Sequence, residues 1–244
     1  MANNSFSVDG RKVLVVGGTR GIGRAIAWRL AENGAQVIAT YVRDRDSAQS
    51  LADQARANGL QLTVYKADVT RDTAVNELLG HVSATLGNAD AMVYSAATGV
   101  HKPVLELTGR QFDFTFSLNV RAFLELATKI APLMPKGGTI VALTSEGAHR
   151  GIPTYALVGA SKAAVESLVR NMAVELAPRG LTVNALSPGS VLTDAWKALP
   201  DSALRLQQAQ DRSPRHRLTE LDEVADAALF LCSRAARGIS ARRS

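Results

Sequence analysis

The chain has 244 residues, 46% of them hydrophobic and 20% charged, which is enough to bury one large core and favours a single domain over residues 1–244. It contains no run of about 18 apolar residues that would span a bilayer, and its start lacks the basic and apolar segments of a secretory signal, so we expect a cytoplasmic protein without a membrane partner. The net charge of +6 is scattered and aromatic residues make up only 5%, which predicts a solvated basic surface suited to anionic ligands and argues against nucleic-acid binding.

The first predicted elements are a strand, a turn and a helix. A β-branched strand at 12–16 is followed by a glycine-rich turn and an alanine-rich helix at 24–32. A second strand is expected at 36–40 and a polar helix at 47–57. The alternation continues with strands at 61–66, 91–95, 139–144 and 182–186, and with helices at about 72–86, 109–133, 155–177 and 220–236. This order predicts an α/β fold of Rossmann type, a doubly wound parallel sheet that binds ligands at the carboxyl ends of its strands.

The turn after the first strand reads Gly17-Gly18-Thr19-Arg20-Gly21-Ile22-Gly23. Its glycines let the chain turn sharply and let a phosphate approach the backbone N–H groups at a helix N-terminus, where the helix dipole adds to the attraction. Glycines also serve ordinary tight turns, but here a strand precedes the turn, a helix follows it and a second strand comes next. The context favours a dinucleotide site, and the expected cofactor-binding residues are Gly17, Thr19, Arg20, Gly21, Ile22 and Gly23.

The end of the second strand selects between the two nicotinamide dinucleotides. An acidic residue there would accept hydrogen bonds from the ribose 2′-OH and repel a 2′-phosphate. This strand ends Thr40-Tyr41-Val42-Arg43 without a carboxylate, and Arg43 together with Arg20 is suited to hold a phosphate. We therefore expect NADPH rather than NADH, with Tyr41 beside it. A shift of one or two residues in the strand boundary would instead bring the carboxylate of Asp44 near the ribose.

The end of the third strand supplies a further cofactor segment, Ala67-Asp68-Val69. It falls at the sheet edge where the adenine should lie. Asp68 either contacts the adenine or begins a turn, and Val69 is expected to line the same position.

Metal chemistry is not expected in this chain. Cys232 has no cysteine partner and falls in an apolar helix pattern, which excludes a disulfide and a cysteine-based metal site. His101 and His149 follow strand ends near the expected pocket, but no second ligand at metal spacing accompanies either.

Taken together, residues 10–236 resemble the short-chain dehydrogenase/reductase family. The glycine turn is similar to the family's GxxxGxG turn, and Pro188-Gly189 to the Pro-Gly after its sixth strand. Single residues also match positions that the family uses, namely Asp68 for adenine, Asn119 in a helix, Ser145 after the fifth strand and Lys162 as the catalytic lysine. The resemblance implies a cofactor site that also contains Ala96, Lys162, Pro188 and Gly189.

The position of the tyrosine sets this chain apart from most of that family. Most members place a tyrosine four residues before the lysine, where this chain has Val158, whereas Tyr155 lies seven residues before Lys162. This spacing resembles the enoyl-acyl-carrier-protein reductase branch, and 96–99 resembles its NADPH-dependent form. Residues seven apart share nearly the same helix face about 10.5 Å apart along the axis. In enoyl thioester reduction the oxygen that gathers charge lies two bonds further from the hydride acceptor than in ketone reduction, so we interpret the spacing as an adaptation to the longer acceptor.

The resemblance implies NADPH-dependent reduction of the carbon–carbon double bond of an enoyl thioester. In that reaction Tyr155 stabilises or protonates the enolate oxygen, while Lys162 holds the nicotinamide ribose and lowers the pKa of the tyrosine. Ser145 either donates a hydrogen bond to the substrate carbonyl or caps a turn. Asn119 either holds a water or a backbone carbonyl behind the lysine or is simply a buried, hydrogen-bonded helix residue.

Three departures from the family pattern bear on the site and the assembly. Tyr94-Ser95 stands where the family has two asparagines, which alters the polar support behind the cofactor. Glu146 places a carboxylate near the site, where it either selects a cationic or hydroxylated substrate or faces water. The basic tail 237–244 does not supply the family's usual seventh strand, so we expect a six-stranded sheet with an exposed edge and an altered oligomer contact.

Two segments are expected to lie outside the rigid body. Residues 1–10 are predicted to be a flexible start. Residues about 190–216 resemble the family's mobile substrate lid. The apolar side chains of that segment either line an acyl channel or pack the lid on the body, and they are Trp196, Leu199, Leu204 and Leu206.

Two other functions remain open on the sequence. One is a carbonyl (ketone) reductase of the same family that tolerates the moved tyrosine, and the other is a cofactor-binding relative without catalysis. The expected partners are a small-molecule or carrier-bound acyl substrate, an acidic acyl carrier protein that the basic surface would attract, and copies of the same chain in a dimer or tetramer.

Overall fold

Six parallel strands form one sheet in the computed structural model, in the order β3-β2-β1-β4-β5-β6. The structure describes residues 4–193 and 202–241. The strands are β1 (Lys12–Val16), β2 (Gln36–Tyr41), β3 (Leu62–Lys66), β4 (Ala91–Tyr94), β5 (Thr139–Leu143) and β6 (Thr182–Leu186). The order reverses between β1 and β4, which is the topological switch point of doubly wound sheets, and the predicted Rossmann-type α/β fold is confirmed.

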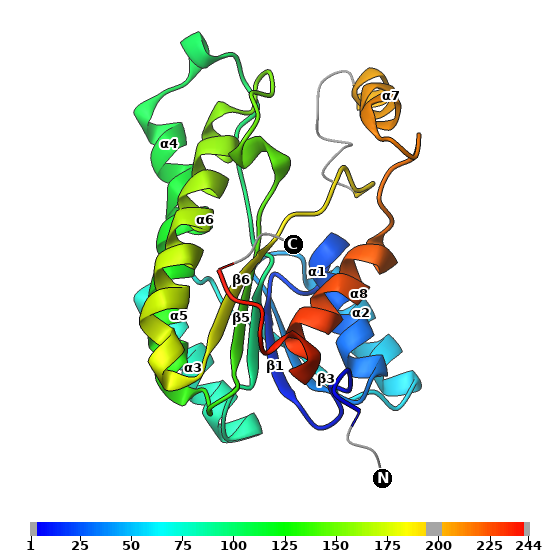
Figure 1. Ribbon diagram of the computed structural model, residues 1–244, viewed down its shortest axis with the longest axis vertical. Coiled ribbons are helices and arrows are strands. Elements are labelled where there is room, and N and C mark those ends of the chain that lie inside the picture. Colours follow the sequence, from blue (N-terminus) through cyan, green and yellow to red (C-terminus); the bar gives the residue numbers. More distant parts are fainter. Residues whose placement is uncertain (1–3, 194–201, 242–244) are drawn as a thin grey trace.

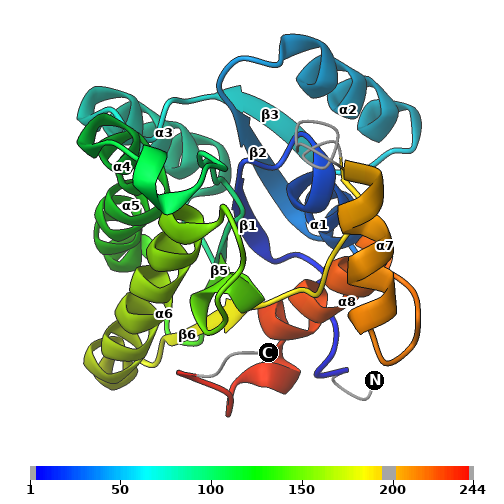
Figure 2. The same ribbon diagram turned by 90° about the horizontal axis from the view of Figure 1, so that it is seen from above.

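Helices cover both faces of this sheet (Figures 1 and 2). One face carries α1 (Gly21–Glu32), α2 (Arg45–Ala57) and α8 (Leu221–Cys232), and the other carries α3 (Asp72–Leu86), α4 (Gly109–Phe116), α5 (Ala122–Ile130) and α6 (Ala156–Leu176). Helix α7 (Ser202–Arg212) lies beyond the carboxyl ends of the strands. Short helical turns occur at Val104–Glu106, Ser117–Arg121, Ala131–Leu133, Glu146–Ala148, Ala177–Arg179 and Arg234–Ala236. Within the described ranges, no helix is long and apolar enough to cross a membrane.

The core is divided into two layers by the sheet. Successive side chains of a strand point to opposite faces, so Leu14 packs with residues of α3 and α5, whereas Val15 packs with residues of α1 and α8. Because helices cover both faces, the central strands are mostly apolar, and every residue of β4 and β5 is buried.

The helix expected at 109–133 is interrupted in the structure. It consists of α4, a π-helical turn at Ser117–Arg121, and α5. The hydrophobic pattern continues through the interruption, because a π turn adds a single residue and leaves the apolar face nearly in register. The turn directs Asn119 into the interior, where the residue is 1% exposed.

The start of the described chain differs from the flexible segment expected at 1–10. Val8 is fully buried in the core beside α1, and the backbone N–H of Gly10 donates to the carbonyl of Gly34 at 2.9 Å. The buried side chain of Val8 therefore holds residues 4–10 against the body, although most of the residues around it in the sequence are polar.

The basic tail partly covers the edge of the sheet that we expected to be exposed. The backbone N–H of Ala241 donates to the carbonyl of Val183 in β6 at 2.9 Å, and the side-chain amide of Asn184 donates to the carbonyl of Ile239 at 2.8 Å. Ser240 accepts a hydrogen bond from the N–H of Val183 through its hydroxyl, at 3.2 Å. The predicted six-stranded sheet with its edge at β6 is confirmed, and tail residues satisfy some groups of that edge without forming a strand in the described part of the chain.

Candidate active site

The glycine turn lies at the carboxyl end of the sheet, between β1 and the neighbouring tips of β2 and β4. The backbone N–H of Gly17 donates to the hydroxyl of Thr40 at 3.1 Å, and that of Gly18 to the carbonyl of Thr40 at 3.0 Å. A Cβ atom on Gly17 would lie 2.9 Å from the backbone of Ala96, and the residue has a φ of +73°. Only glycine fits this position, and Ala96 borders the turn as the sequence predicted.

The N-terminus of α1 is open to an anion. The N-cap residue Arg20 makes no side-chain cap hydrogen bond, and the first turn of α1 contains no acidic residue. Among the described residues, a Cβ atom on Gly21 would meet only Thr193, at 3.7 Å, whereas one on Gly23 would lie 2.1 Å from the carbonyl oxygen of Gly17. Uncapped N–H groups with this free approach fit the pyrophosphate of a dinucleotide. Of the other predicted turn residues, Thr19 is buried and Ile22 is half-buried.

Asp44 is the N-cap residue of α2. Its two carboxylate oxygens accept from the backbone N–H and the hydroxyl of Ser47, at 2.9 and 2.7 Å, so it caps the N-terminus of α2. These hydrogen bonds, with a smaller contribution from Arg20, hold the pKa of the Asp44 carboxyl below its usual value. The strand ends at Tyr41, and the side chains of Arg20 and Arg43 remain exposed. The tip of β2 therefore presents two exposed guanidinium groups beside a carboxylate that caps α2.

Asp68 begins a turn, which is one of its two predicted roles. Its Oδ1 accepts from the backbone N–H of Thr70 at 3.1 Å and from the Thr70 hydroxyl at 2.6 Å. Val69 beside it is buried in the core. The pair lies at the tip of β3, next to Tyr41 on the neighbouring strand, and its contact with adenine stays a prediction.

Tyr155 and Ser145 are brought together by the start of α6. The Tyr155 hydroxyl donates to Oγ of Ser145 at 3.3 Å. The tyrosine ring packs directly on Gly147, where a Cβ atom would lie 2.5 Å from it, and the carbonyl of Gly147 approaches Gly159 one turn along α6. Burial raises the pKa of Tyr155, and the hydrogen bond to Ser145 offsets only part of that rise. The phenol therefore keeps its proton at neutral pH and acts as a hydrogen-bond donor.

Lys162 lies two turns further along α6 with its ammonium group in the interior. Its Nζ donates to the carbonyl of Leu143, at the end of β5, at 2.8 Å. Burial lowers the pKa of Lys162 to about 8. Burial has the largest effect on the pKa of Tyr155 in this arrangement and raises it, and a lowering of that pKa by Lys162 during the reaction stays a prediction.

Val158 occupies the position that most of the family gives to its tyrosine. It is buried and packs on Gly99 in the loop after β4, where an added Cβ atom would lie 2.1 Å from the valine Cγ2. The usual tyrosine position is therefore filled by an apolar side chain in contact with the loop after β4. The tyrosine three residues earlier is the one that reaches Ser145.

Asn119 clamps the loop after β4 to α6. Its Oδ1 accepts from the backbone N–H of Thr98 and its Nδ2 donates to the carbonyl of the same residue, both at 2.8 Å. Nδ2 also donates to Oγ of Ser161, next to Lys162, at 2.9 Å. The asparagine therefore connects the loop after β4 to the residue that precedes Lys162, and it does so from the π turn.

Tyr94 and Ser95 give the loop after β4 its own support. The buried Tyr94 hydroxyl donates to the carbonyl of Leu118, inside the π turn, at 2.7 Å. Oγ of Ser95 lies 3.1 Å from where a Cβ atom on Gly23 would be, so it packs against the cofactor turn. At Tyr94 the polar support is therefore a hydrogen bond to a backbone carbonyl of the π turn.

Two side chains, those of His101 and Glu146, lie near the tyrosine. The ring of His101 lies 5.4 Å from the ring of Tyr155, centroid to centroid. Glu146 pairs with Arg150 at 2.8 Å on the surface, which favours its solvent-facing role. Across the described residues, no three His, Cys, Asp or Glu side chains are placed to hold a metal ion.

Glu166 is a site residue that the sequence analysis missed. It is 3% exposed and contacts the Nε2 atom of His149, and it accepts from the hydroxyl of Thr144 at 2.8 Å. A signal was present, because Glu166 falls between the buried apolar positions Val165 and Val169 of α6. A carboxylate there needs polar partners.

The base of the predicted lid is anchored beside α8. Val191 forms a parallel bridge with Thr219, and Gly189 approaches the Thr219 hydroxyl so closely that a Cβ atom would lie 2.8 Å from it. Pro188 beside it is half-buried. Of the apolar lid residues, Leu204 is exposed and Leu206 half-buried, whereas Trp196 and Leu199 lie outside the described residues.

Comparisons with known proteins agree with this geometry. A family profile described as Enoyl-(Acyl carrier protein) reductase matches residues 16–243. Among curated proteins, the 1-cyclohexenylcarbonyl-CoA reductase of Streptomyces collinus is 37% identical over 228 residues, which cover 92% of this chain and 81% of the relative.

Two solved structures superpose along nearly the whole chain. A short-chain dehydrogenase from Burkholderia cenocepacia J2315 in complex with NADP is 32% identical, with a TM-score of 0.90 over 97% of this chain and 96% of the other. A 7α-hydroxysteroid dehydrogenase complexed with NADH and 7-oxo glycochenodeoxycholic acid is also 32% identical, with a TM-score of 0.92 over 100% of this chain and 95% of the other. The resemblance seen in the motifs is thereby confirmed, and this chain belongs to the short-chain dehydrogenase/reductase family.

Proposed function

We propose that the protein reduces the carbon–carbon double bond of an enoyl thioester with NADPH. One observation carries the proposal: Val158 fills the usual tyrosine position against Gly99, while the phenol of Tyr155 reaches Ser145 from the start of α6. The phenol donor is thereby moved relative to Lys162. An enoyl thioester requires such a move, because its negative charge develops on an oxygen two bonds further from the carbon that accepts the hydride. The matched profile and the enoyl-like name of the Streptomyces relative support the same chemistry.

Each residue has a separate task in this reaction. When bound, NADPH supplies the hydride to the β-carbon. The protonated phenol of Tyr155 turns its single O–H from Ser145 to the oxygen that gathers negative charge, and the Ser145 hydroxyl then donates to the phenol oxygen and orients it. Lys162 has one donor on the carbonyl of Leu143 and two more for the hydroxyls of the nicotinamide ribose. Asn119 keeps the loop after β4 in place behind the nicotinamide.

The preference for NADPH rests on charge at the tip of β2. Arg20 and Arg43 are exposed there, and the nearest carboxylate, that of Asp44, is occupied by Ser47. A solved relative contains NADP and another contains NADH, so the family accommodates both. The two arginines favour the phosphorylated form in this chain.

The substrate is tested with purified protein and NADPH. The candidate substrates are crotonyl-CoA, a crotonyl carrier-protein thioester, acetoacetyl-CoA and simple ketones, and the absorbance of the nicotinamide is the readout. We expect the crotonyl thioesters to be reduced, with the carrier-bound form favoured because the basic chain attracts an acidic carrier protein. Tyr155→Phe should lower kcat by roughly 100-fold or more and leave the NADPH affinity unchanged. The control Tyr65→Phe, on β3, removes a hydroxyl outside the site. Turnover of ketones alone would overturn the proposal.

Carbonyl reduction is the second candidate. The hydroxyls of Tyr155 and Ser145 are hydrogen-bonded to each other, and such a pair is also suited to polarise a ketone. A solved relative holds a 7-oxo steroid. This candidate predicts turnover of ketones without turnover of crotonyl thioesters. Binding of NADPH without turnover of any substrate would instead indicate a relative that binds cofactor without catalysis.

A further inference from the structure

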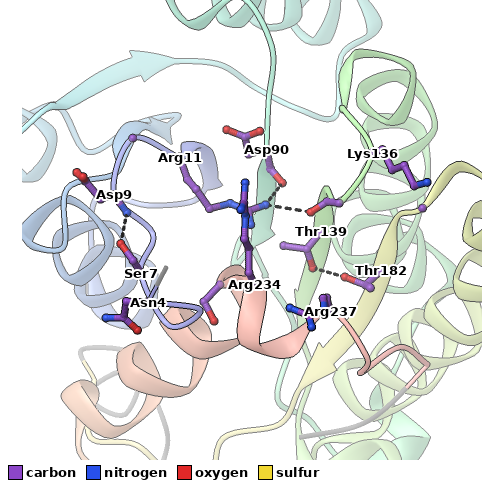
Figure 3. Close-up of a pocket in the computed structure, with 14 residues that line it drawn as sticks. Asn4, Ser7, Asp9, Arg11, Asp90, Lys136, Thr139, Thr182, Arg234 and Arg237 are labelled. Atoms are coloured by element: carbon purple, nitrogen blue, oxygen red, sulfur yellow. Dashed lines mark hydrogen bonds between the residues drawn. The ribbon is translucent and has the colours of Figure 1, made fainter. Parts of the chain in front are cut away.

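A second polar cavity lies at the opposite edge of the sheet from the candidate active site. Its volume is about 630 Å³, and it is bordered by the amino ends of the strands, including Thr139 and Thr182, the first residues of β5 and β6 (Figure 3). Because all strands are parallel, their amino ends are a strand length away from the glycine turn and Tyr155. The cavity is therefore separate from the cofactor site.

Positive charge predominates in this cavity. Four cationic side chains line it and two carboxylates, Asp9 and Asp90, accompany them; the cations are Arg11, Lys136, Arg234 and Arg237. One carboxylate, that of Asp90, already accepts from the backbone N–H of Lys12 at 2.9 Å. Considering residues 4–193 and 202–241, none of the four cations forms an ion pair.

Arg11 has a donor without an acceptor at the centre of this cavity. Its Nη2 donates to the carbonyls of Asp90 and Gly137, at 2.9 and 3.2 Å, which fixes the guanidinium (Figure 3). Its Nε is buried and has no hydrogen-bond partner among the described residues. A buried charged N–H without an acceptor is costly, and a water or an anion that enters beside it would satisfy it. In Figure 3 the side chain of Arg234 points toward the same place from the far side of the cavity.

The donors favour one class of ligand. Guanidinium groups bind the oxygens of a phosphate through two or more N–H donors, and an anion between Arg11 and Arg234 would offset the repulsion of their like charges. The cavity is larger than a phosphate ion needs and falls in the range of small-molecule sites. Its walls are polar, with Asn4, Ser7 and the hydroxyls of Thr139 and Thr182 beside the two carboxylates. We infer that this cavity binds a phosphate-bearing small molecule with hydroxyl groups, the phosphate lying between Arg11 and Arg234.

The test measures binding of ribose 5-phosphate and of inorganic phosphate by calorimetry at constant ionic strength. Arg234→Ala/Arg237→Ala removes two exposed cations of the cavity and should weaken binding at least tenfold. Arg20→Ala/Arg43→Ala is the matched control, because it removes two arginines from the cofactor site and should leave this binding unchanged. Ribose without phosphate should not bind.

Three outcomes would overturn the inference: no binding to the unaltered protein, equal binding to the cavity variant, or loss of binding only in the cofactor-site variant. Steady-state reduction of the crotonyl thioester is measured on the same proteins. The inference about the cavity stands or fails on the calorimetry alone, so its failure is distinguishable from failure of the proposed reaction.

Discussion

His149 and Glu166 lie 17 residues apart in the chain, and the imidazole of the first contacts the buried carboxylate of the second. The other carboxylate oxygen of Glu166 accepts from the hydroxyl of Thr144 at 2.8 Å. Thr144 and His149 flank the turn that carries Ser145 and Gly147 against the ring of Tyr155. Glu166 therefore ties both ends of the catalytic turn to α6, and we interpret it as a positioning residue that does not touch substrate.

Glu166→Ala should lower kcat about tenfold or more, because release of the turn misplaces Ser145 and Tyr155. Glu166→Gln should recover much of that loss, since an amide still accepts from Thr144 and pairs with His149. Steady-state kinetics on crotonyl thioester separates kcat from KM, and urea unfolding reports stability.

The control for this prediction is Glu175→Gln, an exposed position on the same helix, which should change neither quantity. A purely structural role would appear as reduced stability with an unchanged kcat in the folded variant. That result would contradict the assignment of Glu166.

Gly159 allows the catalytic turn to approach α6. An added Cβ atom would lie 2.6 Å from the carbonyl oxygen of Gly147, and neither group is a flexible side chain that moves away cheaply. Gly159→Ala should therefore displace the turn, lower stability by about 1–3 kcal/mol and reduce kcat by about tenfold or more. Gly109→Ala, at the open first position of α4, should be neutral or slightly stabilising. Equal activity of the two variants would show that the close approach is not needed.

Much of the fold was predictable because it is encoded locally. The strand at 12–16, the glycine turn and the helix after it each follow from neighbouring residues, and the structure has β1 and α1 in those places. Tyr155 and Lys162 were found in the same way, through spacing on one helix. Local patterns are sufficient where the partners of a residue lie within a few positions of it.

The contacts that were not predicted connect distant parts of the chain. The hydroxyl of Tyr94 bonds the carbonyl of Leu118, 24 residues away, and Asn119 bonds Ser161, 42 residues away. The spacing of residues along the sequence does not reveal these partners, because the packing of the π turn against the sheet determines them. Asp44 shows the opposite error, since a strictly local helix cap was interpreted as a possible contact to the cofactor.

The ammonium of Lys162 should cost stability in the free protein. Its pKa falls from 10.5 to about 8 through burial, so the unfolded chain binds more protons at this group between these values, and stability rises with pH there. Lys162→Met should thus be more stable than the parent at pH 7, by on the order of 1 kcal/mol, and the difference should shrink toward pH 10. Urea unfolding at pH 7 and 9.5 measures both, with the exposed Lys66→Met as control. A variant less stable than the parent at pH 7 would contradict this.

Arg43 should determine which nicotinamide dinucleotide binds. It is exposed after the tip of β2, and the nearby carboxylate of Asp44 is occupied by Ser47, so the guanidinium is available to a 2′-phosphate. Because a charge-assisted hydrogen bond contributes about 1.5–3 kcal/mol, Arg43→Ala should weaken NADPH binding by about tenfold or more and NADH binding much less. Fluorescence titration of both cofactors gives the ratio of affinities, and Arg45→Ala, the exposed first residue of α2, is the matched control. Equal losses for NADPH and NADH in Arg43→Ala would mean that this arginine contacts a part the two cofactors share, and the preference for NADPH would then have to come from Arg20.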